Sequence, residues 1–153
     1  MNKYSNPENN KLFQVTVDEA GAKERAVSLS ARSIKKESKL EAIKMAVSMI
    51  DLTTLEGKDS DGKVNAICRK AIRPMEDSDE IPHVAAVCVY PNLIRTAKGA
   101  LAGSGVKVAS VAASFPSGQS PLKIKIEEVR KVILLGADEL DMVISRGEFL
   151  QGN

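Results

Sequence analysis

Two aspartates in this sequence stand inside apolar stretches that are typical of buried strands. Asp51 lies between Ile50 and Leu52. Asp141 lies within the run ELDMVI, residues 139–144. Burying an unpaired carboxylate is costly, so such a group is paired, hydrogen bonded or functional.

Each candidate residue also has a simpler interpretation. Asp51 fits a cap or turn aspartate at a strand end equally well, whereas the apolar neighbours of Asp141 on both sides favour function. Cys88, inside the apolar run 84–90, is of a type that is often only a small core residue. His83, the only histidine, precedes that run and is typical of a loop histidine. With two cysteines, no CxxC pair and one histidine, a zinc site is nearly excluded.

The alternation of side chains along a strand predicts which face each candidate occupies. In the last run the apolar set must face covering helices, so Asp141 points to the opposite face. The same reasoning directs Leu52 toward helices and Asp51 and Thr53 away from them. Cys88 belongs to one of the two alternating sets of side chains in its own strand. The residues predicted on the face away from the helices are Asp51, Thr53, Cys88 and Asp141.

The elements that must position these residues alternate between two periodicities. Apolar and β-branched runs predict strands at 49–55, 84–90, 106–113 and 139–144. Helices are expected before the first strand, after Asp59-Ser60-Asp61 up to Pro74, from Pro91 to about Ala102, and from Pro121 to Gly136. Strands that alternate with helices of this length predict an α/β fold with a parallel sheet.

Two helices carry specific expectations about their packing. The first predicted helix has the apolar stripe Leu40, Ile43, Val47 and Ile50. The last has the stripe Leu122, Ile126, Val129 and Ile133, with Ser120 as its N-cap and Pro121 at its first position. Residues 1–36 are polar and weakly patterned, and only a short strand at 12–17 and a helix at 19–30 are expected there.

Composition limits the class of protein. The chain has 153 residues, which corresponds to one domain, and a net charge of +2. This charge, with 3% aromatic residues and no tryptophan, argues against a nucleic-acid binder. The polar N-terminus lacks an apolar signal core, and no apolar run approaches the length of a membrane span. A reduced, cytoplasmic protein without membrane contact is expected.

The segment Phe115 to Ser120 joins a predicted strand to a helix at the end of the sheet where α/β proteins bind ligands. It contains neither GxGxxG nor GxxxxGK[ST], so it is not a dinucleotide or Walker-type phosphate loop. It reads otherwise as a tight turn before a capped helix. A flavodoxin-like nucleotide module, suggested only by the alternation of strands and helices, is disfavoured for this reason.

Four motifs in register resemble deoxyribose-phosphate aldolases, a class I aldolase family built on a (β/α)8 barrel. They are IDLTTL at 50–55, AVCVYP at 86–91, FPSG at 115–118 and GADELDMVI at 136–144. The resemblance covers roughly residues 40–153. It divides the chain into an N-terminal extension, residues 1–36, and the N-terminal half of a TIM-barrel domain, residues 37–153, with about four β/α units.

The resemblance implies an activity and roles for the candidate residues. The family cleaves 2-deoxy-D-ribose 5-phosphate reversibly to acetaldehyde and D-glyceraldehyde 3-phosphate through a lysine Schiff base, without metal or other cofactor. Asp141 matches the aspartate that takes part in proton relay beside the Schiff base. Asp51 and Thr53 match residues that line the substrate site, and Cys88 matches a cysteine near it. The partner implied is a phosphorylated sugar.

The same resemblance implies that this chain is truncated and inactive alone. The Schiff-base lysine of the family lies on a later strand. Lys107 begins a strand at the wrong end of the sheet, and Lys123, Lys125 and Lys131 are expected as solvated helix residues. A nucleophilic lysine needs desolvation or a second cation beside it. The alternative is a non-catalytic half-barrel that persists by self-assembly.

The expected half-barrel also predicts association. A closed barrel has no edge strands, whereas four strands leave 50–55 and 139–144 as open edges. The inner residues Ala86, Val111 and Val143 would then meet water. We therefore expect a homo-oligomer that forms through the sheet edges.

Overall fold

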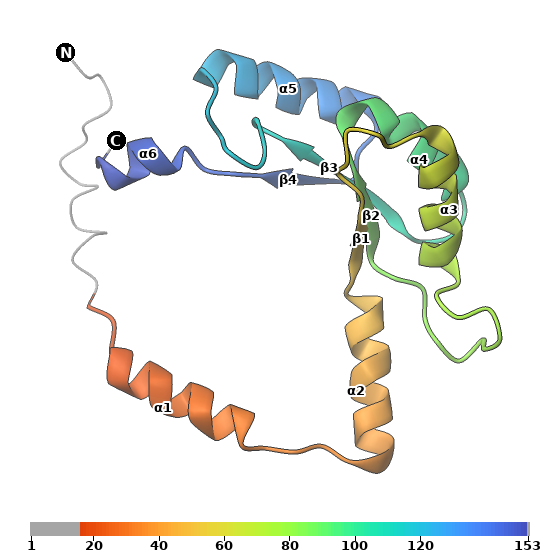
Figure 1. Ribbon diagram of the computed structural model, residues 1–153, viewed down its shortest axis with the longest axis vertical. Coiled ribbons are helices and arrows are strands. Elements are labelled where there is room, and N and C mark those ends of the chain that lie inside the picture. The colour runs from red at the N-terminus through yellow and green to blue at the C-terminus, as the bar shows by residue number, and fades with distance from the viewer. Residues whose placement is uncertain (1–15, 153) are drawn as a thin grey trace.

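Strands and helices alternate along most of the chain (Figure 1) in a computed structural model that describes residues 16–152. The helices are α1 (Glu19–Ser30), α2 (Lys36–Ser48), α3 (Asp61–Ile72), α4 (Ile94–Ala100), α5 (Leu122–Leu135) and α6 (Arg146–Leu150), and a 3-10 turn, η2 (Pro91–Leu93), leads into α4. The strands are β1 (Asp51–Thr53), β2 (Ala86–Val89), β3 (Lys107–Ala112) and β4 (Glu139–Met142). The predicted order of elements from residue 37 onward is confirmed.

The four strands form one parallel sheet in the order β1-β2-β3-β4. Thr53 of β1 lies opposite Cys88 of β2, and Cys88 lies opposite Ala109 of β3. Val111 of β3 lies opposite Asp141 of β4. The register therefore places these five residues, Thr53, Cys88, Ala109, Val111 and Asp141, on the same face of the sheet.

The larger core lies between the other face of the sheet and helices α3, α4 and α5, which cover that face (Figure 1). The strands contribute Val87, Val89 and Val108, all buried, and the helices contribute a larger set: Val64, Cys68, Ile94, Ala97 and Val132. Burial of these apolar side chains is the main term that holds the sheet to the helices. It also fixes the opposite, inner face as the one that carries the polar candidates.

A second, smaller cluster covers the centre of the inner face. Its buried members are Ala86, Cys88, Ala109 and Val111, and the side chains of Leu55, Tyr90 and Phe115 pack on them. The expectation that Ala86 and Val111 meet water is wrong, because these three larger side chains reach over them. The four described strands alone therefore form a small buried apolar cluster on the inner face.

Helix α5 packs with a different stripe from the predicted one. Leu122, Ile126 and Ile133 are exposed, whereas Lys125 and Val132 are buried. Apolar residues run around much of this helix, so periodicity alone did not decide which stripe meets the sheet. The helix also begins at Leu122, with Pro121 at the N-cap position, and the hydroxyl of Ser120 contacts that of Ser114 instead of capping the helix.

Other local signals are confirmed. The side chain of Ser60 accepts a hydrogen bond from the backbone N–H of Lys63 at 3.4 Å and caps α3. Gly136 ends α5 with φ of 98°, a left-handed conformation that favours glycine. Strand β1 is shorter than expected, because Met49 ends α2 and its N–H bonds to Ala46.

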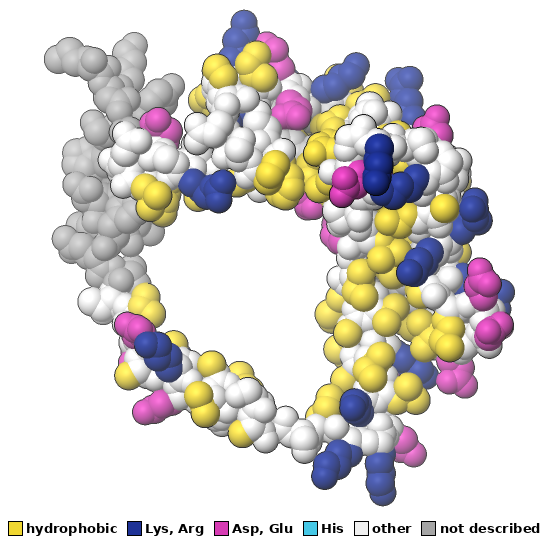
Figure 2. All heavy atoms as spheres, viewed as in Figure 1, with side chains coloured by type: hydrophobic (Ala, Val, Ile, Leu, Met, Phe, Trp, Pro, Cys, Tyr) yellow, Lys and Arg dark blue, Asp and Glu magenta, His cyan; other side chains and the backbone are white. Residues whose placement is uncertain are grey.

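The N-terminal helices contribute little to the core, and only Val47 of α2 packs against it. Neither α1 nor α2 has a buried residue, and α1 lies away from the sheet (Figure 1). Leu40 and Ile43 of the predicted α2 stripe are exposed, and Figure 2 shows hydrophobic side chains along this helix. Of the strand predicted at 12–17, residues 12–15 lie outside the described part, and residues 16 and 17 are irregular.

No helix among residues 16–152 is long and apolar enough to cross a membrane.

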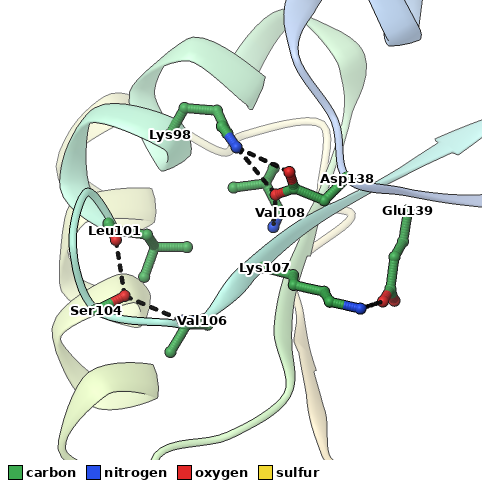
Figure 3. A network of polar contacts seen from close by, with 8 residues as sticks. All are labelled: Lys98, Leu101, Ser104, Val106, Lys107, Val108, Asp138 and Glu139. Carbon is green, nitrogen blue, oxygen red and sulfur yellow. Dashed lines mark hydrogen bonds and ion pairs between the residues drawn. The ribbon is translucent and has the colours of Figure 1, made fainter.

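Polar contacts hold the amino ends of β3 and β4 together (Figure 3). The Asp138 carboxylate accepts hydrogen bonds from the Val108 backbone N–H at 2.9 Å and from the Lys98 ammonium at 3.0 Å. These contacts hold the pKa of Asp138 below its ordinary value, the Val108 N–H having the larger effect. Lys107 forms an ion pair with Glu139 at 2.7 Å. This network lies at the opposite end of β4 from Ser145 and α6.

Candidate functional site

The inner face brings Cys88 and Asp141 into direct contact. The Cys88 thiol donates a hydrogen bond to Asp141 Oδ2 at 3.2 Å. Their strands are not neighbours: β3 runs between them, with Ala109 beside Cys88 and Val111 beside Asp141. The contact therefore crosses the sheet over β3, where the small side chain of Ala109 occupies little space.

The environment of Cys88 makes its thiol a proton donor in this contact. Burial raises the pKa of the Cys88 thiol to about 12, with further contributions from the hydrogen bond to Asp141, the charge of Asp141 and the charge of Asp51. A reactive cysteine needs a lowered pKa and access to solvent. Cys88 is fully buried and stays protonated at neutral pH, so it can orient Asp141 but is not a nucleophile.

Asp51 lies on the same face of the sheet but closer to the amino ends of the strands. It opens β1 and pairs with Ala86, the first residue of β2, instead of ending its strand as the sequence suggested. Partial burial and the neighbouring carboxylates of Glu139 and Asp141 raise its pKa. Asp51 therefore belongs to the same electrostatic group as Asp141.

Thr53 follows two residues later and also points to the inner face. It lies opposite Cys88 in the parallel register, and its hydroxyl donates to the Asp51 carbonyl oxygen at 3.4 Å. The four predicted site residues thus share one face of the sheet, at neighbouring positions in the register.

The loop between β3 and α5 lies at the carboxyl ends of the strands. Ala113 and Ser114 have φ of 58° and 59°, which turns the chain sharply after β3. The Ser114 N–H donates to the Glu128 carboxylate of α5 at 2.8 Å, which fixes the turn. Gly118 has φ of 69°, and a Cβ there would lie 3.0 Å from the Ile144 carbonyl oxygen. The loop therefore approaches the chain that leaves β4 very closely.

Lys125 departs from the sequence-based expectation of a solvated lysine. It is only 7% exposed, and its ammonium donates a hydrogen bond to the Ser145 hydroxyl at 2.6 Å. The expectation was wrong because it assigned the wrong stripe of α5 to the core. Reading the stripe as Lys125, Val129 and Val132, which has the same period, would have placed this lysine inward.

No described strand offers a lysine at its carboxyl end. The strands carry one lysine, Lys107, at the amino end of β3 and paired with Glu139. Lys125 lies on α5, in the helical layer and not on the inner face. Within residues 16–152 no three His, Cys, Asp or Glu side chains come together in a way that could hold a metal ion.

Comparison with known proteins places this arrangement among aldolases. The model of the DeoC/LacD family aldolases matches residues 45–149. The chain is 39% identical over 152 residues to the deoxyribose-phosphate aldolase of Homo sapiens and 41% identical to that of Mus musculus. Each match covers 92% of this chain and 48% of the relative, so the chain spans about half the length of these curated relatives.

A solved structure agrees with the fold. The deoxyribose phosphate aldolase of Aeropyrum pernix, described as tetrameric, is 30% identical and superposes with a TM-score of 0.56. The superposition covers 69% of this chain and 41% of that one. The four parallel β/α units are therefore part of an α/β barrel of the TIM type, as predicted.

Proposed function

The chain belongs to the DeoC/LacD aldolase family, and we propose that residues 37–153 supply the N-terminal half of the active site of a deoxyribose-phosphate aldolase. The reaction is the reversible cleavage of 2-deoxy-D-ribose 5-phosphate to acetaldehyde and D-glyceraldehyde 3-phosphate through a lysine Schiff base. Residues 1–36 are assigned to an N-terminal extension that precedes this half in the sequence. Names of the relatives and the four motifs in register support this assignment.

Asp141 is the residue of this chain that acts on protons in the proposed reaction. When the carbon–carbon bond breaks, a substrate hydroxyl loses its proton and becomes the carbonyl of one product, while the bonding electrons move toward the Schiff base. The enamine carbon that results must then take up a proton. A carboxylate on the inner face can relay both protons.

The remaining site residues prepare this carboxylate and line the substrate site. Cys88, as a neutral donor, restricts the orientation of Asp141 through the 3.2 Å hydrogen bond. Asp51 and Thr53 line the adjacent part of the inner face, where a hydroxylated sugar chain would find acceptors and a hydroxyl group. The observation that carries the proposal is the contact between Cys88 and Asp141 on the inner face of a sheet from an aldolase family member.

The catalytic lysine is not supplied by the described strands, so we propose that this chain is inactive by itself. The activity therefore needs the other half of a barrel. A direct test is a chimera in which residues 37–153 replace the matching segment of the mouse deoxyribose-phosphate aldolase. We expect retro-aldol activity in the chimera, measured as release of acetaldehyde from 2-deoxyribose 5-phosphate.

Variants of the chimera test the role of Asp141. We expect Asp141→Asn to lower kcat by about 10²–10⁴-fold, the usual contribution of a general acid–base group. Asp77→Asn, in the exposed loop between α3 and β2, is the matched control and should retain activity. A folded chimera without activity, or an Asp141→Asn effect below about threefold, would overturn the proposal for this residue.

A second candidate function is a non-catalytic half-barrel that persists by self-assembly. The observation that favours it is the pair of edge strands, β1 and β4, each of which has a partner on only one side in the described sheet. The tetrameric description of the Aeropyrum pernix relative is consistent with homo-oligomers in this family. Activity in the chimera would favour the first candidate, whereas a folded but inactive chimera together with association of the 153-residue chain would favour the second.

A further inference from the structure

The carboxyl end of β4 is held by contacts that lie beyond its hydrogen-bonded pairing with β3. That pairing ends at Met142, one residue after Asp141. Three residues further on, Ser145 accepts the hydrogen bond from the Lys125 ammonium at 2.6 Å. The backbone next to it, at Ile144, lies against Gly118. The segment between Asp141 and α6 is therefore fixed by the β3–α5 loop and by the first turn of α5.

Lys125 is an unusual residue for this position. A buried ammonium loses hydration, and that loss must be offset by hydrogen bonds. An apolar side chain of similar length would occupy the same space, beside Gly118 and Ser145, without this cost. What the ammonium adds is a directional bond from a helix to the chain leaving β4, which apolar packing cannot supply.

The helix that carries Lys125 is itself anchored to the site side of the sheet. Glu128, one turn later on α5, accepts from the Ser114 N–H at 2.8 Å, directly after β3. Val132 of the same helix is fully buried in the core. Lys125 thus extends from a rigid support, so a displacement of Ser145 is resisted by β3 and α5 together.

We propose that Lys125 is a positioning residue: its buried ammonium, hydrogen bonded to Ser145, fixes the carboxyl end of β4 and thereby holds Asp141 against Cys88. The importance of this role for catalysis rests on the proposed function. The contact that it protects, between Cys88 and Asp141, is a property of the chain whatever reaction the site performs.

Alkylation of the two cysteines tests the proposal without any aldolase assay. Cys88 reports on the contact with Asp141, whereas Cys68, fully buried between α3 and the other face of the sheet, reports on the core. The 153-residue chain is treated with iodoacetamide, and the labelling rate of each cysteine is measured by peptide mass spectrometry. Lys125→Met removes the ammonium at similar length, Ser145→Ala removes its acceptor, and Lys123→Met makes the same change at an exposed position of α5.

We expect Lys125→Met and Ser145→Ala to speed the labelling of Cys88 by about tenfold, the effect of a pKa change of one unit, and to leave Cys68 unchanged. Lys123→Met should leave both cysteines at their original rates. In an Asp141→Asn background, Lys125→Met should add no further acceleration at Cys88, because the carboxylate charge that the contact brings to the thiol is already removed.

Three results would overturn the proposal: unchanged labelling of Cys88 in Ser145→Ala, equal acceleration of both cysteines, or full additivity with Asp141→Asn. If Lys125→Met does not fold, Ser145→Ala decides, since it deletes only one oxygen from a partly exposed residue. An inactive chimera would refute the proposed function and leave this thiol result untouched, so the two failures are distinguishable.

Discussion

Cys88 and Asp141 are 53 positions apart in the chain, yet the thiol of the first donates a hydrogen bond to the carboxylate of the second at 3.2 Å, across an intervening strand. The relationship is reciprocal. The carboxylate keeps the thiol protonated, and the protonated thiol restricts the carboxylate. A site that must move protons through one aspartate gains a defined orientation for it from a neutral hydrogen-bond donor.

Asp141→Asn should lower the pKa of Cys88 from its value of about 12, because the charge that disfavours the thiolate is removed. Burial remains, so the pKa should stay above that of an exposed cysteine. The measurement is the pH dependence of Cys88 alkylation in the 153-residue chain. Asp138→Asn, at the amino end of β4, is the control. An unchanged profile in Asp141→Asn would show that the contact does not form in solution.

Asp138 should make stability depend on pH in the acid range. Its pKa is lowered in the folded state, so the folded chain binds fewer protons than the unfolded chain near the ordinary value of 3.8. The contribution is therefore present above that pH and is lost as the pH falls through the lower folded-state pKa. Asp138→Asn should cost about 1 kcal/mol at pH 7, since the carboxylate and Lys98 are partly exposed and screened.

Urea denaturation of wild type and Asp138→Asn at pH 7 and below pH 3 measures this contribution. The difference between the two proteins should shrink at the lower pH. Asp77→Asn, in the exposed 75–82 loop, should show no comparable difference. A difference for Asp138→Asn that is independent of pH would mean that packing, and not charge, explains its effect.

Ionisation of Asp51 should have the opposite effect on stability from ionisation of Asp138. Its pKa is raised in the folded state by partial burial and by Glu139 and Asp141, so ionisation at neutral pH opposes folding. Asp51→Asn should therefore raise the free energy of unfolding at pH 7, by less than about 1 kcal/mol because the side chain is exposed. Below the ordinary pKa of 3.8 the gain should vanish. A loss of stability at pH 7 would contradict this electrostatic account.

The sequence predicted the faces of the strands better than the contacts at their ends. Alternation alone placed Thr53, Cys88 and Asp141 on one side, since a residue that faces helices fixes its neighbours. Asp51 was placed on the correct face but at the wrong end of its strand, because the start of β1 depends on where α2 ends. Boundaries of this kind are set by local backbone hydrogen bonds, which the hydrophobic pattern does not encode.

Lys125 shows a different limit of sequence reasoning. Helix α5 is apolar at Leu122, Ile126 and Ile133, which is a complete stripe at helical spacing, yet these residues are exposed. The sheet selects the face with Val132 and accepts a lysine in it because Ser145 provides an acceptor. Such a pair is defined by tertiary geometry between residues 20 apart, so neither residue alone signals the contact.

The 153-residue chain should form no specific Schiff base. The described strands carry no lysine at a carboxyl end, and a nucleophilic lysine requires desolvation or a neighbouring cation on the reacting side. Borohydride reduction in the presence of acetaldehyde should leave no single stoichiometric adduct, as measured by intact mass. The chimera is the positive control. Stoichiometric labelling of one lysine, Lys125 included, would show that the chain carries its own nucleophile.

The 153-residue chain should associate in solution through its sheet edges. Strands β1 and β4 each have a free side in the described sheet, and exposed edges of this kind pair with other chains. Exposed apolar side chains lie near them, including Met142 on β4 and Ile50 before β1. Light scattering at low micromolar concentration should give a mass above the 16.4 kDa of one chain.

Charge at the edge should weaken this association. Met142→Lys places an ammonium beside the free side of β4, and an inserted lysine is a common way in which proteins block edge pairing. Met75→Lys, at a similarly exposed methionine in the loop after α3, is the matched control and should leave the mass unchanged. A monomer that melts sharply in the wild type would contradict association, and equal effects of the two variants would locate it away from the β4 edge.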